Sequence, residues 1–197
     1  MPDAGGSFAE LKSGPPSCTR SDTPAERVAV RAARESDLTQ IAAIWNHEVL
    51  GTDATTDTEP RSLISQREWL AGHTERYPVV VALAPGDREP SDTVLAYGSL
   101  SPYRATPAFA RTVEDSVYVE WSHRGTGLGG LILAELIRRA WALEHHSILA
   151  RITAKNCASL RLHARHGFQL VGTERESAYK LGRWHDVTIM QRRLDSP

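Results

Sequence analysis

Apolar and polar positions follow regular spacings from about residue 28 to residue 194. Alternation and short continuous apolar runs predict strands, whereas apolar residues three and four positions apart predict helices. Strands are expected at 28–33, 79–84, 93–100, 112–121, 148–154, 168–175 and 186–194. Helices are expected around 38–49 and at 63–73, 127–144 and 157–166, with Leu63, Trp69 and Leu70 of the second helix facing the core. The order β-α-α-β-β-β-α-β-α-β-β predicts a mixed α/β fold.

The composition gives a near-neutral net charge, and the sequence gives no indication that the protein is exported. The 197 residues include 23 Lys and Arg against 24 Asp and Glu, which gives a net charge of −1. This balance argues against a protein that binds nucleic acid or an anionic membrane through charge. No apolar run is long enough to span a bilayer, no signal peptide is evident, and the two cysteines predict no disulfide framework. We therefore expect a cytoplasmic protein, with a disordered extension at 1–26 and a folded domain at 27–197.

A strand that runs into a glycine-rich turn and then an apolar helix is the strongest local signal. Val117-Tyr118-Val119 leads into Arg124-x-x-Gly127-x-Gly129, and the helix follows directly. Glycines leave backbone N–H groups uncovered, and a helix N-terminus adds the positive end of its dipole, so the junction suits an anion such as pyrophosphate. Taken alone, the same residues fit a tight turn that only opens a helix.

The element order and several spaced motifs together resemble the GCN5-related N-acetyltransferases, in particular the phosphinothricin and methionine sulfoximine/sulfone acetyltransferase branch. The motifs that carry the resemblance are Trp45-Asn46-His47, Arg76-Tyr77-Pro78, the stretch 112–119, the glycine turn, 152–159, 162–168 and 180–187. The resemblance covers about residues 28 to 194. It implies a mixed central sheet of six to seven strands, flanked by about four helices and splayed between the fourth and fifth strands. It also implies a homodimer.

The resemblance implies acetyl-CoA as the co-substrate, bound along the fourth strand and at the helix that follows it. The residues expected to bind it are Val117, Tyr118, Val119, Arg124, Gly125, Thr126, Gly127, Leu128, Gly129, Gly130, Asn156 and Ser159. Asn156 also fits the N-cap of the helix that begins beside it. No Gly-Lys-Ser/Thr follows the glycines, which excludes a P-loop nucleotide site.

Glu114 is the expected general base, because the branch places its catalytic glutamate three residues before the Val-Tyr-Val. An amine with a pKa of about 8 is mostly protonated at neutral pH and must lose a proton before it attacks a thioester. A nearby carboxylate can take that proton, and partial burial makes it a better base. Glu120 is the rival base, disfavoured by its place beside the phosphate turn. A carboxylate that only faces solvent is the alternative for Glu114.

His163 is the second catalytic candidate, since the branch has histidine where much of the wider family protonates the departing thiolate with tyrosine. An imidazole can serve as acid or base near neutral pH. The alternative is a histidine that packs its helix against the sheet. His163 and His166 have a spacing that could bind a metal, but no third ligand is evident, so no metal is expected. Cys157 has no paired base and is not expected to act as a nucleophile.

Recognition of the amine is expected from the loop before the fourth strand. A carboxylate on the substrate suits an arginine, so Arg104 and Arg111 compete for that role, with Phe109 lining the pocket. Relatives carry an aromatic ring near Thr56, and its absence here predicts a wider or more polar pocket. Three residues of the late motif, Lys180, Trp184 and Asp186, are expected to close the site, although Trp184 also fits the core.

The sequence therefore favours an enzyme that acetylates the amino group of a small amino-acid-like substrate by direct attack on acetyl-CoA. Two alternatives remain open at this stage. One is an acetyltransferase for a different amine, such as a peptide or a polyamine. The other is a CoA-binding module without catalysis, which the presence of both Glu114 and His163 disfavours.

Overall fold

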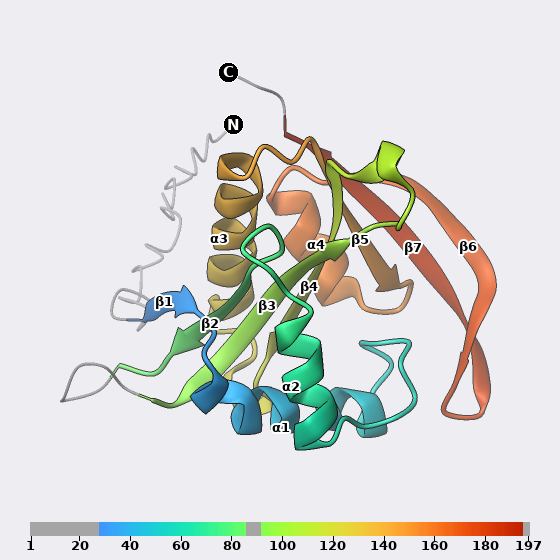
Figure 1. The fold of residues 1–197 in the computed structure, drawn as a ribbon. Helices are drawn as coiled ribbons and strands as arrows, with labels where there is room; N and C mark the ends of the chain where they lie inside the picture. Colours follow the sequence, from blue (N-terminus) through green and yellow to red (C-terminus); the bar gives the residue numbers. More distant parts are fainter. Residues whose placement is uncertain (1–27, 86–91, 195–197) are drawn as a thin grey trace, which may run out of the picture.

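Seven strands of the described chain form one mixed sheet in the order β1-β2-β3-β4-β5-β7-β6 (Figure 1). The computed structural model describes residues 28–85 and 92–194, so the expected extension at 1–26 lies outside it. The strands are β1 (Ala29–Ala32), β2 (Val79–Leu83), β3 (Val94–Pro102), β4 (Thr112–Val119), β5 (Ser147–Thr153), β6 (Gln169–Lys180) and β7 (Arg183–Arg193). The helices are α1 (Leu38–Gly51), α2 (Leu63–Ala71), α3 (Leu128–Ala142) and α4 (Cys157–Arg165). The predicted fold class and element order are confirmed.

Helices cover both faces of the sheet, with α1 and α2 on one side and α3 and α4 on the other (Figure 1). The apolar stripe of α3, which includes Ile132, Leu133 and Leu136, is fully buried in the larger core cluster. Ile41 and Trp45 of α1 belong to a second cluster on the opposite face. Within the described residues, no helix is both long and apolar enough to cross a membrane.

Gly98 in β3 lets α3 approach the sheet closely. A Cβ atom built at this position would lie 2.5 Å from a methyl carbon of Ile132 and 2.8 Å from the Ser116 carbonyl oxygen. Both distances are shorter than a van der Waals contact, so any larger residue would displace the helix or its neighbouring strand. The glycine thereby fixes how near α3 comes to β3.

The sheet opens between β4 and β5, as the sequence predicts. The two strands pair in parallel only from Thr112 to Glu114, against Ser147 to Leu149. Beyond that point β4 continues to Val119 along β3, while β5 continues along β7. Two unpaired strand edges therefore face each other across a gap whose walls carry main-chain hydrogen-bonding groups.

The β6–β7 hairpin is longer than the sequence predicts. Its two-residue turn places both Leu181 and Gly182 at positive φ, 52° and 73°, which matches the twist of a tight hairpin. Most side chains of β6 face solvent, so the strand lacks the alternation that reveals a half-buried strand.

Two expectations about packing were wrong. Trp184, for which the core was one alternative, has 58% of its surface exposed and packs edge-on against the equally exposed Tyr179 of β6. Leu63 of α2 is 49% exposed rather than turned inward. The expected homodimer stays a prediction.

Candidate active site

A small cavity of about 190 Å³ lies on the α1/α2 face of the sheet. Its floor comes from β3 and β4, where alternate residues point to the same face. Three cross-strand pairs supply this floor: Ser101 with Glu114, Ser99 with Ser116, and Tyr97 with Tyr118. The antiparallel register therefore places the predicted catalytic carboxylate at one end of the cavity and two stacked tyrosine rings at the other.

The opposite wall of the small cavity holds an arginine between two indole rings. The Arg61 guanidinium carbon lies 4.0 Å from the ring centre of Trp45 and 5.1 Å from that of Trp69. Asn46 fixes the backbone of Arg61 by accepting from its N–H at 2.8 Å and donating to its carbonyl at 3.0 Å. In the described part of the chain, the guanidinium makes no hydrogen bond or ion pair of its own. A preorganised cation is thus available to an anionic ligand.

Glu114 is half-buried in this cavity, and burial raises the pKa of its carboxyl group. Arg151 of β5 opposes that rise, while the nearby Asp115 and Glu174 carboxylates add to it. Arg151 itself is exposed and pairs with Glu174 at 2.6 Å. Because the shift moves the carboxyl toward neutral pH, Glu114 is a stronger base than an exposed glutamate.

A larger cavity of about 540 Å³ fills the gap between β4 and β5 and reaches the first turns of α3 and α4. Gly127 is the N-cap of α3 with a φ of 93°, and Gly125 has a φ of 79°. Both values lie in the left-handed region that other residues avoid. The N–H groups in the first turn of a helix have no partner within it, so this end of α3 offers donors and a positive dipole to an anion.

Most of the residues predicted to bind the co-substrate line this larger cavity. They are Val117, Tyr118, Val119, Arg124, Gly125, Gly127, Gly129, Gly130, Asn156 and Ser159. Thr126 and Leu128 do not line it: the Thr126 hydroxyl donates to the His123 carbonyl at 2.6 Å, and Leu128 is buried in the core. The Asn156 side chain caps α4 by accepting from the Ser159 N–H at 3.1 Å, so its role as a helix cap is confirmed.

Charged side chains around the larger cavity were only partly predicted. Arg124 pairs with Glu48 of α1, whose carboxylate is only 2% exposed. Arg161 and Arg165 of α4 also line the cavity, and their i, i+4 spacing places them on one helix face. That spacing beside the Asn156 cap is the sequence signal that could have revealed them.

His163 forms a buried pair with Asp115 of β4. Its Nε2 lies 3.0 Å from Asp115 Oδ2, and its Nδ1 lies 2.8 Å from the Ser159 carbonyl oxygen. Burial lowers the pKa of His163, but the hydrogen bond and charge of Asp115 outweigh it, so the pKa lies above its ordinary value. Both ring nitrogens face acceptors, an arrangement that favours the doubly protonated imidazolium form.

The two cavities meet along the middle of β4. Five residues line both of them: Ala54, Asp115, Ser116, Tyr118 and Arg151. The unpaired edge of β4 thus lies between the two cavities. In the part of the chain that the structure describes, the small cavity contains the free Arg61 guanidinium and the Glu114 carboxyl group with its raised pKa. The larger cavity contains the start of α3, which suits an anion. A group held in one can react with a group held in the other near Asp115 and Ser116.

Other predicted residues lie away from both cavities. Arg104 stacks against Tyr103 and Phe109, and its side chain is exposed. Arg111 donates to the Glu144 carbonyl at 2.8 Å, which ties the start of β4 to the end of α3. Their assignment to substrate binding, with that of Phe109, stays a prediction.

The rival base Glu120 also lies outside both cavities. Hydrogen bonds from Ser122 and His123 lower the pKa of its carboxyl group. A carboxylate engaged in this way is a weaker base than Glu114.

Comparison with known proteins identifies the family. Residues 30–189 match the model of the acetyltransferase (GNAT) domain. The phosphinothricin N-acetyltransferase of Streptomyces coelicolor is 43% identical over 167 residues, which cover 85% of this chain and 96% of that protein. An L-methionine sulfoximine/L-methionine sulfone acetyltransferase of Pseudomonas aeruginosa is 38% identical over 167 residues, covering 84% of this chain and 94% of that protein.

Solved structures agree with the sequence relatives. A phosphinothricin acetyltransferase of the GNAT superfamily from Sinorhizobium meliloti, in complex with acetyl-CoA, superposes with a TM-score of 0.79 at 34% identity. The match covers 85% of this chain and 89% of that protein.

Proposed function

The chain belongs to the GNAT acetyltransferase family, and we propose that it moves an acetyl group from acetyl-CoA to the amino group of a small amino-acid-like substrate. Phosphinothricin, methionine sulfoximine and methionine sulfone are the acceptors that the relatives' names suggest. The proposal rests mainly on one observation: the two cavities meet at Asp115, Ser116 and Tyr118, which line both of them. One cavity suits the donor and the other suits a small zwitterion.

The larger cavity fits acetyl-CoA, which supplies the acetyl thioester. Gly125 and Gly127 at positive φ leave the start of α3 open to a phosphate, and Cβ atoms at both positions would meet only open space. Arg161 and Arg165 add positive charge at the neighbouring helix. The unpaired main chain of β4 from Asp115 to Val119 can bond the amides of the pantetheine arm, as an added strand would.

Glu114 serves as the general base in this proposal. It accepts a proton from the substrate ammonium, directly or through water, so that the nitrogen gains a lone pair for attack on the thioester carbon. The transfer is direct, and no acyl-enzyme forms on Cys157, which lies exposed at the start of α4.

His163 is the proton donor for the sulfur that leaves. Its ring lines the larger cavity, and Asp115 and the Ser159 carbonyl favour its protonated form. The Nε2–H must first break its hydrogen bond with Asp115 to reach the sulfur; once the proton has left, Asp115 remains beside the neutral imidazole and favours its reprotonation.

Arg61 is the partner that we propose for the substrate carboxylate. Unlike Arg104 and Arg111, it lines the small cavity, and its guanidinium is free of other ion pairs in the described residues. The polar loop 54–57, with Thr56, completes that wall in place of the aromatic ring expected in relatives. A polyamine lacks the carboxylate that would match Arg61, and a peptide would need a more open acceptor site.

Thiol release from acetyl-CoA tests the proposal. The purified protein is offered methionine sulfone, methionine sulfoximine, phosphinothricin, a polyamine and a peptide with a free N-terminus. We expect turnover with one or more of the three amino acids and little with the others. Tight CoA binding without turnover of any amine would instead support the module that binds CoA and does not catalyse.

A further inference from the structure

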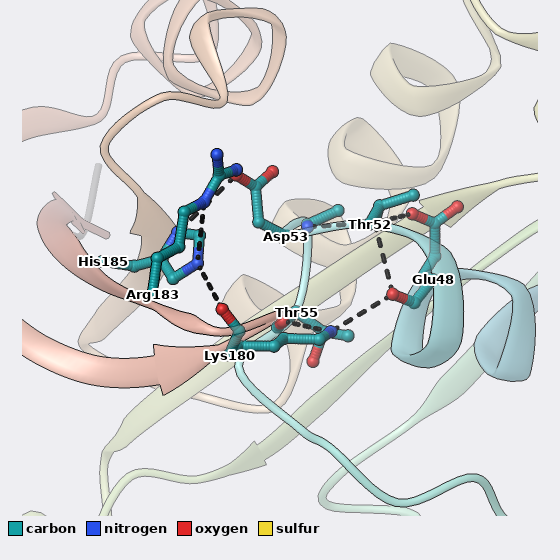
Figure 2. Close-up of polar contacts among 8 residues, drawn as sticks. Glu48, Thr52, Asp53, Thr55, Lys180, Arg183 and His185 are labelled. Atoms are coloured by element: carbon teal, nitrogen blue, oxygen red, sulfur yellow. Dashed lines mark hydrogen bonds and ion pairs between the residues drawn. The ribbon is translucent and has the colours of Figure 1, made fainter.

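The distant β6–β7 hairpin contacts one wall of the small cavity, and Figure 2 shows the side chains that make these contacts. This wall is the loop of residues 52–57, which follows α1. Thr55, Thr56 and Asp57 line only the small cavity, and Ala54 lines both cavities. Within the loop, side chains bond to neighbouring backbone: the Ala54 N–H donates to the Thr52 hydroxyl at 3.1 Å.

Lys180, the last residue of β6, reaches this loop with a buried ammonium group. Its Nζ donates to the Thr55 carbonyl at 2.8 Å and to the Glu48 carbonyl at 3.2 Å, and the residue is only 4% exposed (Figure 2). Burial lowers the pKa of Lys180, and the surrounding Asp57, Asp53 and Glu48 carboxylates partly oppose that change. A cation is rarely buried without such partners, because desolvating it is costly.

The two carbonyl groups depend on Lys180 to different degrees. The Glu48 carbonyl at the end of α1 also accepts from the Thr52 N–H at 3.2 Å and from the Thr52 hydroxyl at 3.3 Å. In the described part of the chain, Lys180 is the only donor to the Thr55 carbonyl. Loss of the ammonium would therefore leave the helix end capped but release the loop at Thr55.

The hairpin fixes the position of the ammonium. The Lys180 carbonyl lies 3.0 Å from the His185 Nε2 across the turn, and Arg183 donates to Asp53 at 3.1 Å (Figure 2). The first contact is buried, whereas the Arg183 side chain is 54% exposed. The hairpin thus makes a buried contact to the loop through the Lys180 ammonium and an exposed one through Arg183, and these two contacts provide a matched pair for experiment.

We propose that Lys180 is a positioning residue for the acceptor: by holding the Thr55 carbonyl, it sets the wall of the small cavity that contacts the amine. The inference rests on the proposed acetyl transfer, in which this cavity holds the amine. It assigns no chemical step to Lys180. Within the described residues, Lys180 bonds to one residue of the larger cavity, at the Glu48 carbonyl, and Thr52 still donates to that carbonyl without it, so binding of acetyl-CoA should change far less than binding of the amine.

The test compares Lys180→Met with Arg183→Gln by steady-state kinetics on both substrates. Loss of a hydrogen bond from a charged donor to an otherwise unpaired carbonyl should raise the KM for the amine on the order of 10-fold. The KM for acetyl-CoA should stay within about twofold, and Arg183→Gln should change neither value by more than that, because exposed ion pairs contribute little. An unchanged KM for the amine, or a parallel rise in both KM values, would overturn the proposal.

A second variant and a second measurement keep the result decisive. Lys180→Arg retains a cation, so it decides the question if Lys180→Met does not fold. Its larger, planar guanidinium does not fit the buried position of the ammonium between the two carbonyls, so a selective but smaller rise in the KM for the amine is expected. Hydrogen exchange adds a readout without turnover: amides of residues 53–57 should exchange faster in the variant, and those of 124–130 should not. If the wild type acetylates no amine, the proposed function fails, and this exchange pattern alone decides on Lys180. Unchanged exchange at 53–57 would then refute it.

Discussion

Replacement of Glu114 by glutamine should remove the base while keeping the shape of the small cavity. General base catalysis contributes about 10²–10⁴-fold, so we expect kcat/KM for the amine to fall within that range at neutral pH. The lower end is favoured here, because an amine with a pKa of about 8 is still about one-tenth unprotonated at pH 7. The KM for acetyl-CoA should not change, since Glu114 does not line the larger cavity.

The pH dependence follows from the direction of the Glu114 shift. Burial raises the pKa of this carboxyl group, so the wild-type rate should fall on the acidic side with a midpoint above the ordinary value of about 4.3. In Glu114→Gln the part of that limb set by the Glu114 carboxyl should disappear, and the pH dependence of the amine should remain. The variant should instead gain about 10-fold between pH 7 and pH 9, as the amine loses its own proton.

The assay is thiol release from acetyl-CoA, followed from pH 5 to pH 9 with saturating donor. Glu120→Gln is the matched control, because this second glutamate of the same region lies outside both cavities and is engaged by Ser122 and His123. It should keep both the rate and the acidic limb. Full activity in Glu114→Gln, or loss of the limb only in Glu120→Gln, would refute the assignment of the base.

Three further substitutions test the remaining roles. Arg61→Gln should raise the KM for an amino-acid acceptor about 10- to 100-fold, the cost of losing a charged hydrogen bond, and an effect found only in Arg104→Gln would assign the carboxylate to Arg104. Gly127→Ala places an alanine at a φ of 93°, which residues other than glycine avoid. Calorimetry should then show weaker acetyl-CoA binding, with the KM for the amine retained. Unchanged affinity for acetyl-CoA would argue against a phosphate site at this turn. His163→Gln should lower kcat about 10²-fold if the ring protonates the leaving sulfur, whereas lower thermal stability with unchanged kcat would leave it a structural partner of Asp115.

The parts of the fold that the sequence predicted are those set by local patterns. The apolar run of β2, the stripe of α3 and the glycines at its start each carry their signal within a few residues. Glu114 and the splayed strands followed from the resemblance, and the structure places Glu114 in the small cavity.

The residues that were missed depend on contacts between distant segments. Arg61 lies in a polar loop with no periodicity, and only the packing of Trp45 and Trp69 brings it over β4. The Asp115–His163 pair joins residues 48 positions apart. Lys180 was expected to close the site, but its contact was hidden, because nothing in β6 itself indicates that its last side chain crosses to the loop after α1.

We propose an acceptor amine that carries a carboxylate and is acetylated where the two cavities meet. The most direct test compares kcat/KM for methionine sulfone with that for 3-(methylsulfonyl)propylamine, the same molecule without its carboxylate, at equal concentrations of unprotonated amine. A free Arg61 beside the acceptor predicts a preference of about 10-fold or more for the amino acid, from one charged hydrogen bond. Equal kcat/KM values for the two amines, or a preference for the amine without the carboxylate, would contradict the account.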